Sequence, residues 1–132
     1  QLAKTGLSPS LFCFEISAKT AIALPHQTHD LIAQLHQLGC QITLDDVVPS
    51  EAIIRLIDQL PLNYVKLSFT CMDSHQMKNP YLWQQLRKSL QRQSAQAIAK
   101  GIESPAILKA ARAQDIHHVQ GYQIERPQLL QT

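Results

Sequence analysis

Short apolar runs alternate along the chain with longer segments in which apolar residues recur at helical spacing. Each run is too short for a helix and is bounded by turn residues, as is typical of a buried strand. The runs cover residues 11–16, 41–44, 64–67, 96–99 and 118–120. Strands and helices in such regular alternation predict parallel strands joined by right-handed crossovers, and therefore an α/β fold.

The segments between the runs predict helices with recognisable ends. Gly39 can take the left-handed conformation that ends a helix, and Ser50 can cap the start of the next one. Residues 72–79, in contrast, are polar and predict a connecting loop. The helices are expected at residues 31–38, 53–60 and 82–90, and from residue 105 onward.

Five predicted strands favour part of a barrel over a complete one. A closed (β/α) barrel has eight strands and typically about 250 residues, whereas this chain has 132. Residues 1–6 resemble the last turn of a helix that begins further upstream. An open five-stranded sheet would account for the same pattern. We favour the C-terminal part of a TIM-type (β/α) barrel, with residues 1–132 forming one partial domain.

Composition narrows the class of protein. Hydrophobic residues make up 45% of the chain and charged residues 17%, which fits a globular domain. The net charge is +2 and the basic residues are scattered, so no nucleic-acid groove is expected. No apolar stretch approaches the roughly 20 residues of a membrane helix, and we expect a cytoplasmic protein without a membrane partner. Cys13, Cys40 and Cys71 lack metal-ligand spacing and are expected to be reduced packing residues.

Polar side chains recur where the predicted strands end. Because the ends of parallel strands converge on one face, these side chains are expected to meet. Carboxylates bind Mg²⁺ or Mn²⁺, a lysine neutralises a phosphate, and two metal ions activate water for attack on a phosphodiester. Taken singly, each has a simpler interpretation, such as a solvated carboxylate or a strand-end lysine that reaches solvent. The residues are Glu15, Asp45, Asp46, Lys66, Lys100, Glu103 and Gln120.

Five motifs surround these residues in a fixed order. They are Phe14-Glu15-Ile16-Ser17, Leu44-Asp45-Asp46, Leu60-Pro61-Leu62-Asn63-Tyr64-Val65-Lys66, Ile98-Ala99-Lys100-Gly101-Ile102-Glu103 and Val119-Gln120-Gly121-Tyr122. In this order they resemble the motifs E-I-T-E, D-D-F-G-T-G, L-P-x-D-x-I-K-I-D, A-E-G-V-E and Q-G-Y of the EAL domain. That family is the bacterial cyclic di-GMP phosphodiesterases. The resemblance covers nearly the whole chain.

The resemblance implies a role for most of the polar residues. Glu15, Asp45 and Asp46 fall on metal-binding positions, and Lys66 and Asp46 fall on catalytic ones. The implied cofactor is Mg²⁺ or Mn²⁺, if any is bound, and the implied ligand is cyclic di-GMP. The positions near the guanine-phosphate pocket are Glu103 and Gln120.

Several residues depart from the family pattern at positions that matter for chemistry. Lys100 stands in place of the first glutamate of A-E-G-V-E, where an ammonium repels a cation and leaves no general base. Ala18 replaces the second glutamate of E-I-T-E, and Ser68 replaces the aspartate of K-I-D. Val47 and Val48 begin the segment that replaces F-G-T-G, and valines resist the positive φ that glycines permit.

Three hypotheses follow. The first is a degenerate EAL-like signalling domain, catalytically inactive, that binds cyclic di-GMP or a partner protein. The second is the C-terminal fragment of an active Mg²⁺- or Mn²⁺-dependent phosphodiesterase, because the name-giving motif and a metal-binding asparagine would lie upstream of Gln1. The third is a purely structural module. An incomplete barrel exposes strand edges and apolar faces, so self-association is expected.

Overall fold

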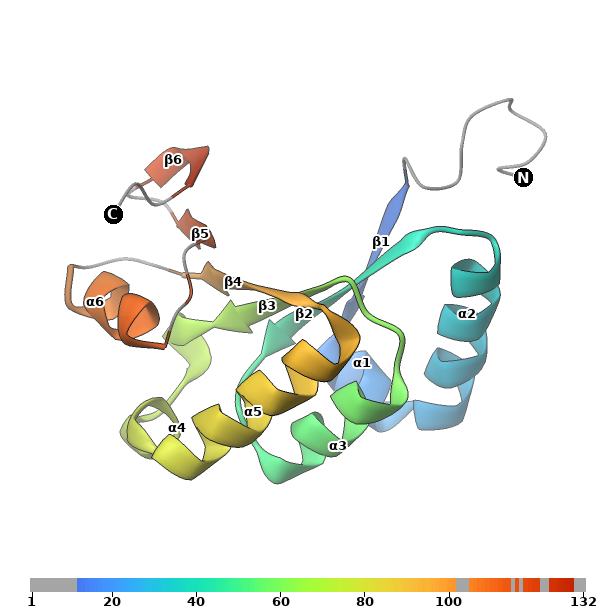
Figure 1. The fold of residues 1–132 in the computed structure, drawn as a ribbon, viewed down its shortest axis with the longest axis horizontal. Helices are drawn as coiled ribbons and strands as arrows, with labels where there is room; N and C mark the ends of the chain where they lie inside the picture. Colours follow the sequence, from blue (N-terminus) through green and yellow to red (C-terminus); the bar gives the residue numbers. More distant parts are fainter. Residues whose placement is uncertain (1–11, 102–104, 115, 117, 122–123, 130–132) are drawn as a thin grey trace.

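The computed structural model describes residues 12–101, 105–114, 116, 118–121 and 124–129. Six strands form one sheet in the order of the sequence (Figure 1). The first five run parallel, and the sixth is antiparallel to the fifth. The strands are β1 (Cys13–Ser17), β2 (Gln41–Val47), β3 (Tyr64–Ser68), β4 (Gln96–Lys100), β5 (His118–Gly121) and β6 (Ile124–Leu129).

The strand order distinguishes a barrel wall from a doubly wound sheet. In a doubly wound sheet the order reverses at a switch point and helices cover both faces. Here the order never reverses, and helices α1 to α5 lie on the same side of the strands, below them in Figure 1. The architecture is that of part of a TIM-type (β/α) barrel, as the sequence predicted, with the helices outside.

The prediction of five strands missed β6. This segment contains Pro127, which has no backbone N–H and is normally confined to edge strands. Within the described residues β6 lies at the edge of the sheet, next to β5 alone, so no further strand there needs that N–H.

The expected helices form, and one predicted loop proves to be helical. Ser50 caps α3 through its side chain, which accepts a hydrogen bond from the Ile53 N–H, and Gly39 has a φ of 85°. Residues 72–79 contain a short helix, because Asp73 and Gln76 form a capping box around its first turn. The helices are α1 (Ala18–Ala23), α2 (Pro25–Gln37), α3 (Glu51–Gln59), α4 (Ser74–Lys78), α5 (Pro80–Gln93) and α6 (Pro105–Ala113).

The main core lies between the helices and the face of the sheet that they cover. Val65 and Leu67 of β3 are almost fully buried there, and Trp83 of α5 is 1% exposed. The Trp83 ring stacks on Phe69 with centroids 5.9 Å apart. Its indole N–H donates to the Met77 carbonyl at 2.9 Å, so a large aromatic residue is buried with its polar atom satisfied.

The cysteines and the helices can be compared with the expectations from the sequence. All three cysteines are free, but only Cys40 is buried; Cys13 and Cys71 are exposed, so the prediction of packing residues is wrong for these two. Among the described residues, no helix combines the length and the apolar character needed to cross a membrane.

Asn63 connects the beginnings of three strands. Its Oδ1 accepts a hydrogen bond from the Ile42 N–H at 2.8 Å, and its own N–H donates to the Ile42 carbonyl at 2.9 Å. Its carbonyl accepts from the Gln96 N–H at 3.0 Å. These bonds help to set β2, β3 and β4 side by side, and that alignment determines which side chains meet at the other ends of the strands.

We predict that Asn63→Ala lowers the free energy of unfolding by about 1–2 kcal/mol, because the N–H of the fully buried Ile42 loses its side-chain acceptor. Urea denaturation measures the change. Gln84→Ala, at an exposed position of α5, is the control and is expected to stay within about 0.5 kcal/mol of the parent. Equal costs for the two substitutions would contradict the role given to Asn63.

Candidate active site

The register of the parallel strands brings one row of side chains together on the face of the sheet away from the helices. Glu15 is the Cα partner of Thr43, and Ser17 is the partner of Asp45 two positions on. Thr43 in turn pairs with Tyr64, so Lys66, two residues further along β3, lies on the same face. Paired residues of neighbouring strands point to the same face, so side chains far apart in sequence become neighbours.

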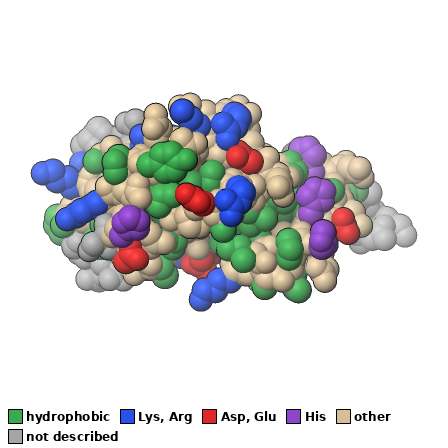
Figure 2. Space-filling view, turned by 90° about the horizontal axis from the view of Figure 1, so that it is seen from below, with side chains coloured by type: hydrophobic (Ala, Val, Ile, Leu, Met, Phe, Trp, Pro, Cys, Tyr) green, Lys and Arg blue, Asp and Glu red, His purple; other side chains and the backbone are tan. Residues whose placement is uncertain are grey.

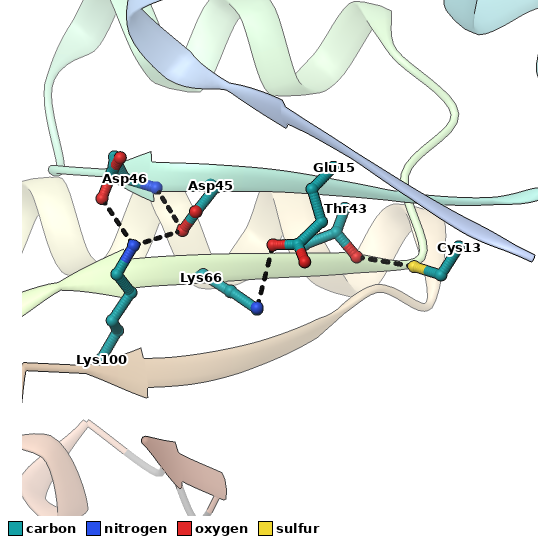
Figure 3. A network of polar contacts seen from close by, with 7 residues as sticks. All are labelled: Cys13, Glu15, Thr43, Asp45, Asp46, Lys66 and Lys100. Carbon is teal, nitrogen blue, oxygen red and sulfur yellow. Dashed lines mark hydrogen bonds and ion pairs between the residues drawn. The ribbon is translucent and has the colours of Figure 1, made fainter. Parts of the chain in front are cut away.

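Two lysines form ion pairs with three carboxylates in this row (Figure 3). The ammonium of Lys100, at the end of β4, donates to Asp45 Oδ1 at 2.9 Å and to Asp46 Oδ1 at 2.8 Å. The ammonium of Lys66, on β3, donates to Glu15 Oε1 at 2.9 Å. The sequence predicted that these five residues converge, but the family resemblance gave Lys66 a catalytic role, and its pairing with Glu15 was not predicted.

A β-bulge allows both aspartates to reach one ammonium. The register of β2 against β3 shifts between Leu44 and Val47, and Asp46 has a φ of 55°. Aspartate tolerates this left-handed conformation better than most residues do. The Asp46 N–H donates to Asp45 Oδ1 at 2.8 Å, which further fixes the bend.

The two valines that replace the first residues of F-G-T-G do not adopt a positive φ. Val47 is fully buried as the last residue of β2, and Val48 packs against the core. The positive φ lies one residue earlier, at Asp46. The residues after the bend are therefore anchored in the hydrophobic core.

The other predicted positions have varied surroundings. Ala18 begins α1 and is 5% exposed, and Ser68 is 2% exposed beside Lys100, its Cα partner. On β5, the backbone of Gln120 pairs with the backbone of Lys100 on β4. The side chain of Gln120 and the whole of Glu103 lie outside the described residues.

The ion pairs change the proton affinities of their partners. Burial is the largest single influence on Asp45 and opposes ionisation, but hydrogen bonds from Lys100 and the Asp46 N–H, with the charges of Lys100 and Lys66, together lower its pKa below 3.8. The hydrogen bond to Asp46 is the largest influence on Lys100. With the bond to Asp45 and both negative charges, it raises the pKa of Lys100 above 10.5 against the effect of burial.

The divalent metal implied by the sequence does not fit this arrangement. A cation bound by Asp45 and Asp46 would occupy the place that the Lys100 ammonium already holds, at hydrogen-bonding distance from both carboxylates. Glu15 is paired with Lys66. Within the described part of the chain, no three His, Cys, Asp or Glu side chains gather into a group that could hold a metal ion.

Comparison with known proteins decides the family. The family model of the EAL domain matches residues 1–127. The chain belongs to the EAL domain family.

Its relatives include named phosphodiesterases. The cyclic di-GMP phosphodiesterase PdeB of Shewanella oneidensis is 29% identical over 120 residues, which are 89% of this chain. The cyclic di-GMP phosphodiesterase NbdA of Pseudomonas aeruginosa is 25% identical over 128 residues, or 96% of this chain. The chain spans only 14% and 16% of the length of these two relatives.

Solved EAL structures have the same fold. The Bacillus subtilis YkuI protein, with an EAL domain in complex with cyclic di-GMP and calcium, has a TM-score of 0.75 at 17% identity. That match covers 95% of this chain and 30% of the other. The FimX EAL domain of Pseudomonas aeruginosa bound to cyclic di-GMP has a TM-score of 0.73 at 24% identity, and the match covers 96% and 52% of the two chains.

The ion pairs predict how stability depends on pH. The pKa of Asp45 is lowered in the folded chain, so its contribution is present above about pH 3.8 and is lost as the pH falls through the folded-state pKa. The pKa of Lys100 is raised, so its contribution is present below about pH 10.5 and is lost as the pH rises beyond it. Lys100→Met is expected to flatten the stability profile at both ends.

Urea denaturation across that pH range measures the effect. Lys88→Met is the matched control, because Lys88 is an exposed lysine of α5, and it should leave the shape of the profile unchanged. Identical profiles for the two variants would show that Lys100 carries no pH-linked stability.

Proposed function

We propose that this EAL domain is degenerate: it does not hydrolyse cyclic di-GMP and acts by binding the dinucleotide or a partner protein. One observation carries the proposal. The ammonium of Lys100 lies 2.9 Å and 2.8 Å from the two carboxylates that the family resemblance assigns to metal binding. Hydrolysis of the family type requires metal ions to activate water, and here a lysine holds the metal position.

The charges of the site support the same conclusion. Glu15, Asp45 and Asp46 carry three negative charges, and the two lysines neutralise two of them. A divalent cation would have to displace Lys100 and leave its ammonium, which is only one-third exposed, without a partner. A carboxylate that accepts hydrogen bonds from an ammonium is also a weaker base toward water. Both changes oppose catalysis.

Binding of the nucleotide does not require the metal. A lysine can neutralise a phosphate directly. Lys100 ends β4 and Lys66 lies in the middle of β3, and each would exchange a carboxylate partner for a phosphate oxygen. The solved FimX EAL domain has cyclic di-GMP bound, and the YkuI structure holds cyclic di-GMP together with calcium. We therefore propose cyclic di-GMP as the nucleotide that this domain recognises.

We predict that the chain converts no cyclic di-GMP to the linear dinucleotide in the presence of Mg²⁺ or Mn²⁺. Chromatography of the reaction products provides the measurement. A parallel calorimetric titration is expected to show binding that is the same with and without Mg²⁺, whereas Lys100→Glu should bind more tightly when the metal is added. Linear product formed by the parent chain would refute the proposal.

A second candidate is an active phosphodiesterase in which further site residues lie outside this chain. It is favoured by the presence of Glu15, Asp45, Asp46 and Lys66 close together on three neighbouring strands. Extending the chain upstream and repeating the product assay separates the two candidates. Hydrolysis that appears only in the longer protein supports the second one, and a longer protein that stays silent at high Mn²⁺ supports the first.

An exposed apolar surface supports a role in protein interaction. Leu31 of α2 and the residues that flank this helix, Leu24 and Leu38, are spaced seven residues apart and are 46–49% exposed, and Ile22 of α1 is 52% exposed. Residues at this spacing share one side of a helix. Figure 2 shows hydrophobic side chains among histidines at the right-hand end, where α2 lies. No lysine or arginine occurs between Lys19 and Arg55, so this surface suits a protein better than an anionic membrane.

We predict that the isolated chain self-associates through this leucine surface and that Leu31→Glu shifts it toward monomer. Sedimentation velocity at micromolar concentrations measures the distribution. Tyr81→Glu, at a hydrophobic residue of α5 that is 57% exposed, is the control and should leave the distribution unchanged. A compact monomer for the parent chain would contradict the prediction.

A further inference from the structure

Asp45 and Asp46 depart from the normal alternation of strand side chains. Consecutive residues of a strand point to opposite faces, yet both of these carboxylates hydrogen-bond to the same ammonium. The bulge in β2 and the φ of 55° at Asp46 make this possible. Two carboxylates at such short range repel each other unless a cation lies between them. The bend therefore depends on a cation at this point.

The structure supplies that cation from two strands away. Lys100 ends β4, and β3 separates β4 from the aspartates on β2. At the same level β3 presents Ser68, a buried and uncharged residue that is the Cα partner of Lys100. A serine carries no negative charge to draw the ammonium away. Lys100 can therefore cross β3 and reach both aspartates.

The backbone after Lys100 turns in a way that strongly favours glycine. Gly101 has a φ of 78°, and a Cβ at this position would lie 2.7 Å from Thr70 Cγ2. The chain therefore leaves β4 tightly against Thr70. This close packing fixes the end of β4 from which the lysine projects.

Lys66, the other lysine of the site, does not pair with Asp45 or Asp46. Lys66 is 16% exposed and is paired with Glu15 at 2.9 Å. Among the described residues, Lys100 is the basic group that hydrogen-bonds to Asp45 and Asp46.

We propose that the ammonium of Lys100 is the permanent cation of this site, in place of the divalent metal of the EAL family. It holds the bend at Asp45 and Asp46 and makes the fold of the β2 end independent of metal. The inference deepens the proposed function and rests on it, since a site that carries its own cation suits binding and not metal-assisted hydrolysis. A tethered cation also needs no free metal in solution, whereas stabilisation by a bound metal depends on its concentration.

Thermal unfolding without nucleotide tests the proposal. The variants are Lys100→Met, Lys100→Glu and Lys100→Arg, with Lys88→Met as the control. We expect Mn²⁺, compared with NaCl of equal ionic strength, to leave the parent chain, Lys100→Arg and Lys88→Met unchanged. Lys100→Met should unfold about 3 °C lower than Lys88→Met and should recover when Mn²⁺ is added. Lys100→Glu should depend on Mn²⁺ most strongly.

Electron paramagnetic resonance of Mn²⁺ gives a readout that a purely structural role for Lys100 would not change. The signal of free Mn²⁺ should fall in the presence of Lys100→Glu or Lys100→Met and persist with the parent chain. If Lys100→Glu does not fold, Lys100→Met decides the question alone. The proposal is overturned if the parent binds Mn²⁺ as strongly as Lys100→Met does, or if Lys100→Met loses stability without gaining any from Mn²⁺.

The outcomes separate this proposal from the proposed function. Mn²⁺ that stabilises the parent chain without any hydrolysis overturns only the claim about Lys100. Hydrolysis by the parent chain overturns the proposed function, whatever the unfolding temperatures show. A parent that neither responds to Mn²⁺ nor hydrolyses the dinucleotide, together with a metal-responsive Lys100→Met, supports both.

Discussion

The in-register pairing of parallel strands is the constraint on which the rest of this structure depends. Each strand from β1 to β4 is paired with the next, so alternate residues of all four strands share the face away from the helices, except where the bulge in β2 shifts the register. The other face carries the apolar side chains that pack against the helices. The same pairing thus builds the core on one side and collects charged groups on the other.

The charged groups on that face need one another. A buried or half-buried carboxylate requires a partner, and the row supplies two ammonium groups for three carboxylates. In a metal-dependent phosphodiesterase divalent cations would take this role. A lysine differs from a metal ion in one decisive respect: its ammonium compensates charge and donates hydrogen bonds, but it has no open coordination position at which water can be activated. Charge compensation and catalysis are therefore separable in this fold.

Much of the fold could be predicted from the sequence because strands and helices produce local patterns of apolar and polar residues. All five predicted strands form, and Ser50 and Gly39 mark helix ends where they were expected. The failures were also local. The strand β6 was not predicted because it contains Pro127. Proline is normally found only in edge strands, and the sequence does not indicate which strand lies at the edge. The helix α4 was not predicted because its residues are polar. There the Asp73–Gln76 capping box stabilises a helical turn despite the low hydrophobicity of the segment.

For the site, the sequence by itself indicated which polar residues lie on or directly after the strands, because the strands follow from local apolar runs. The resemblance to the EAL motifs also implies that Lys100 stands where the family has a glutamate. Only the tertiary structure decided which charges pair. In it, Lys100 reaches both aspartates and Lys66 reaches Glu15. The physical reason is that pairing depends on the lateral register of strands and on a bulge at Asp46, and neither leaves a periodic signal in the chain.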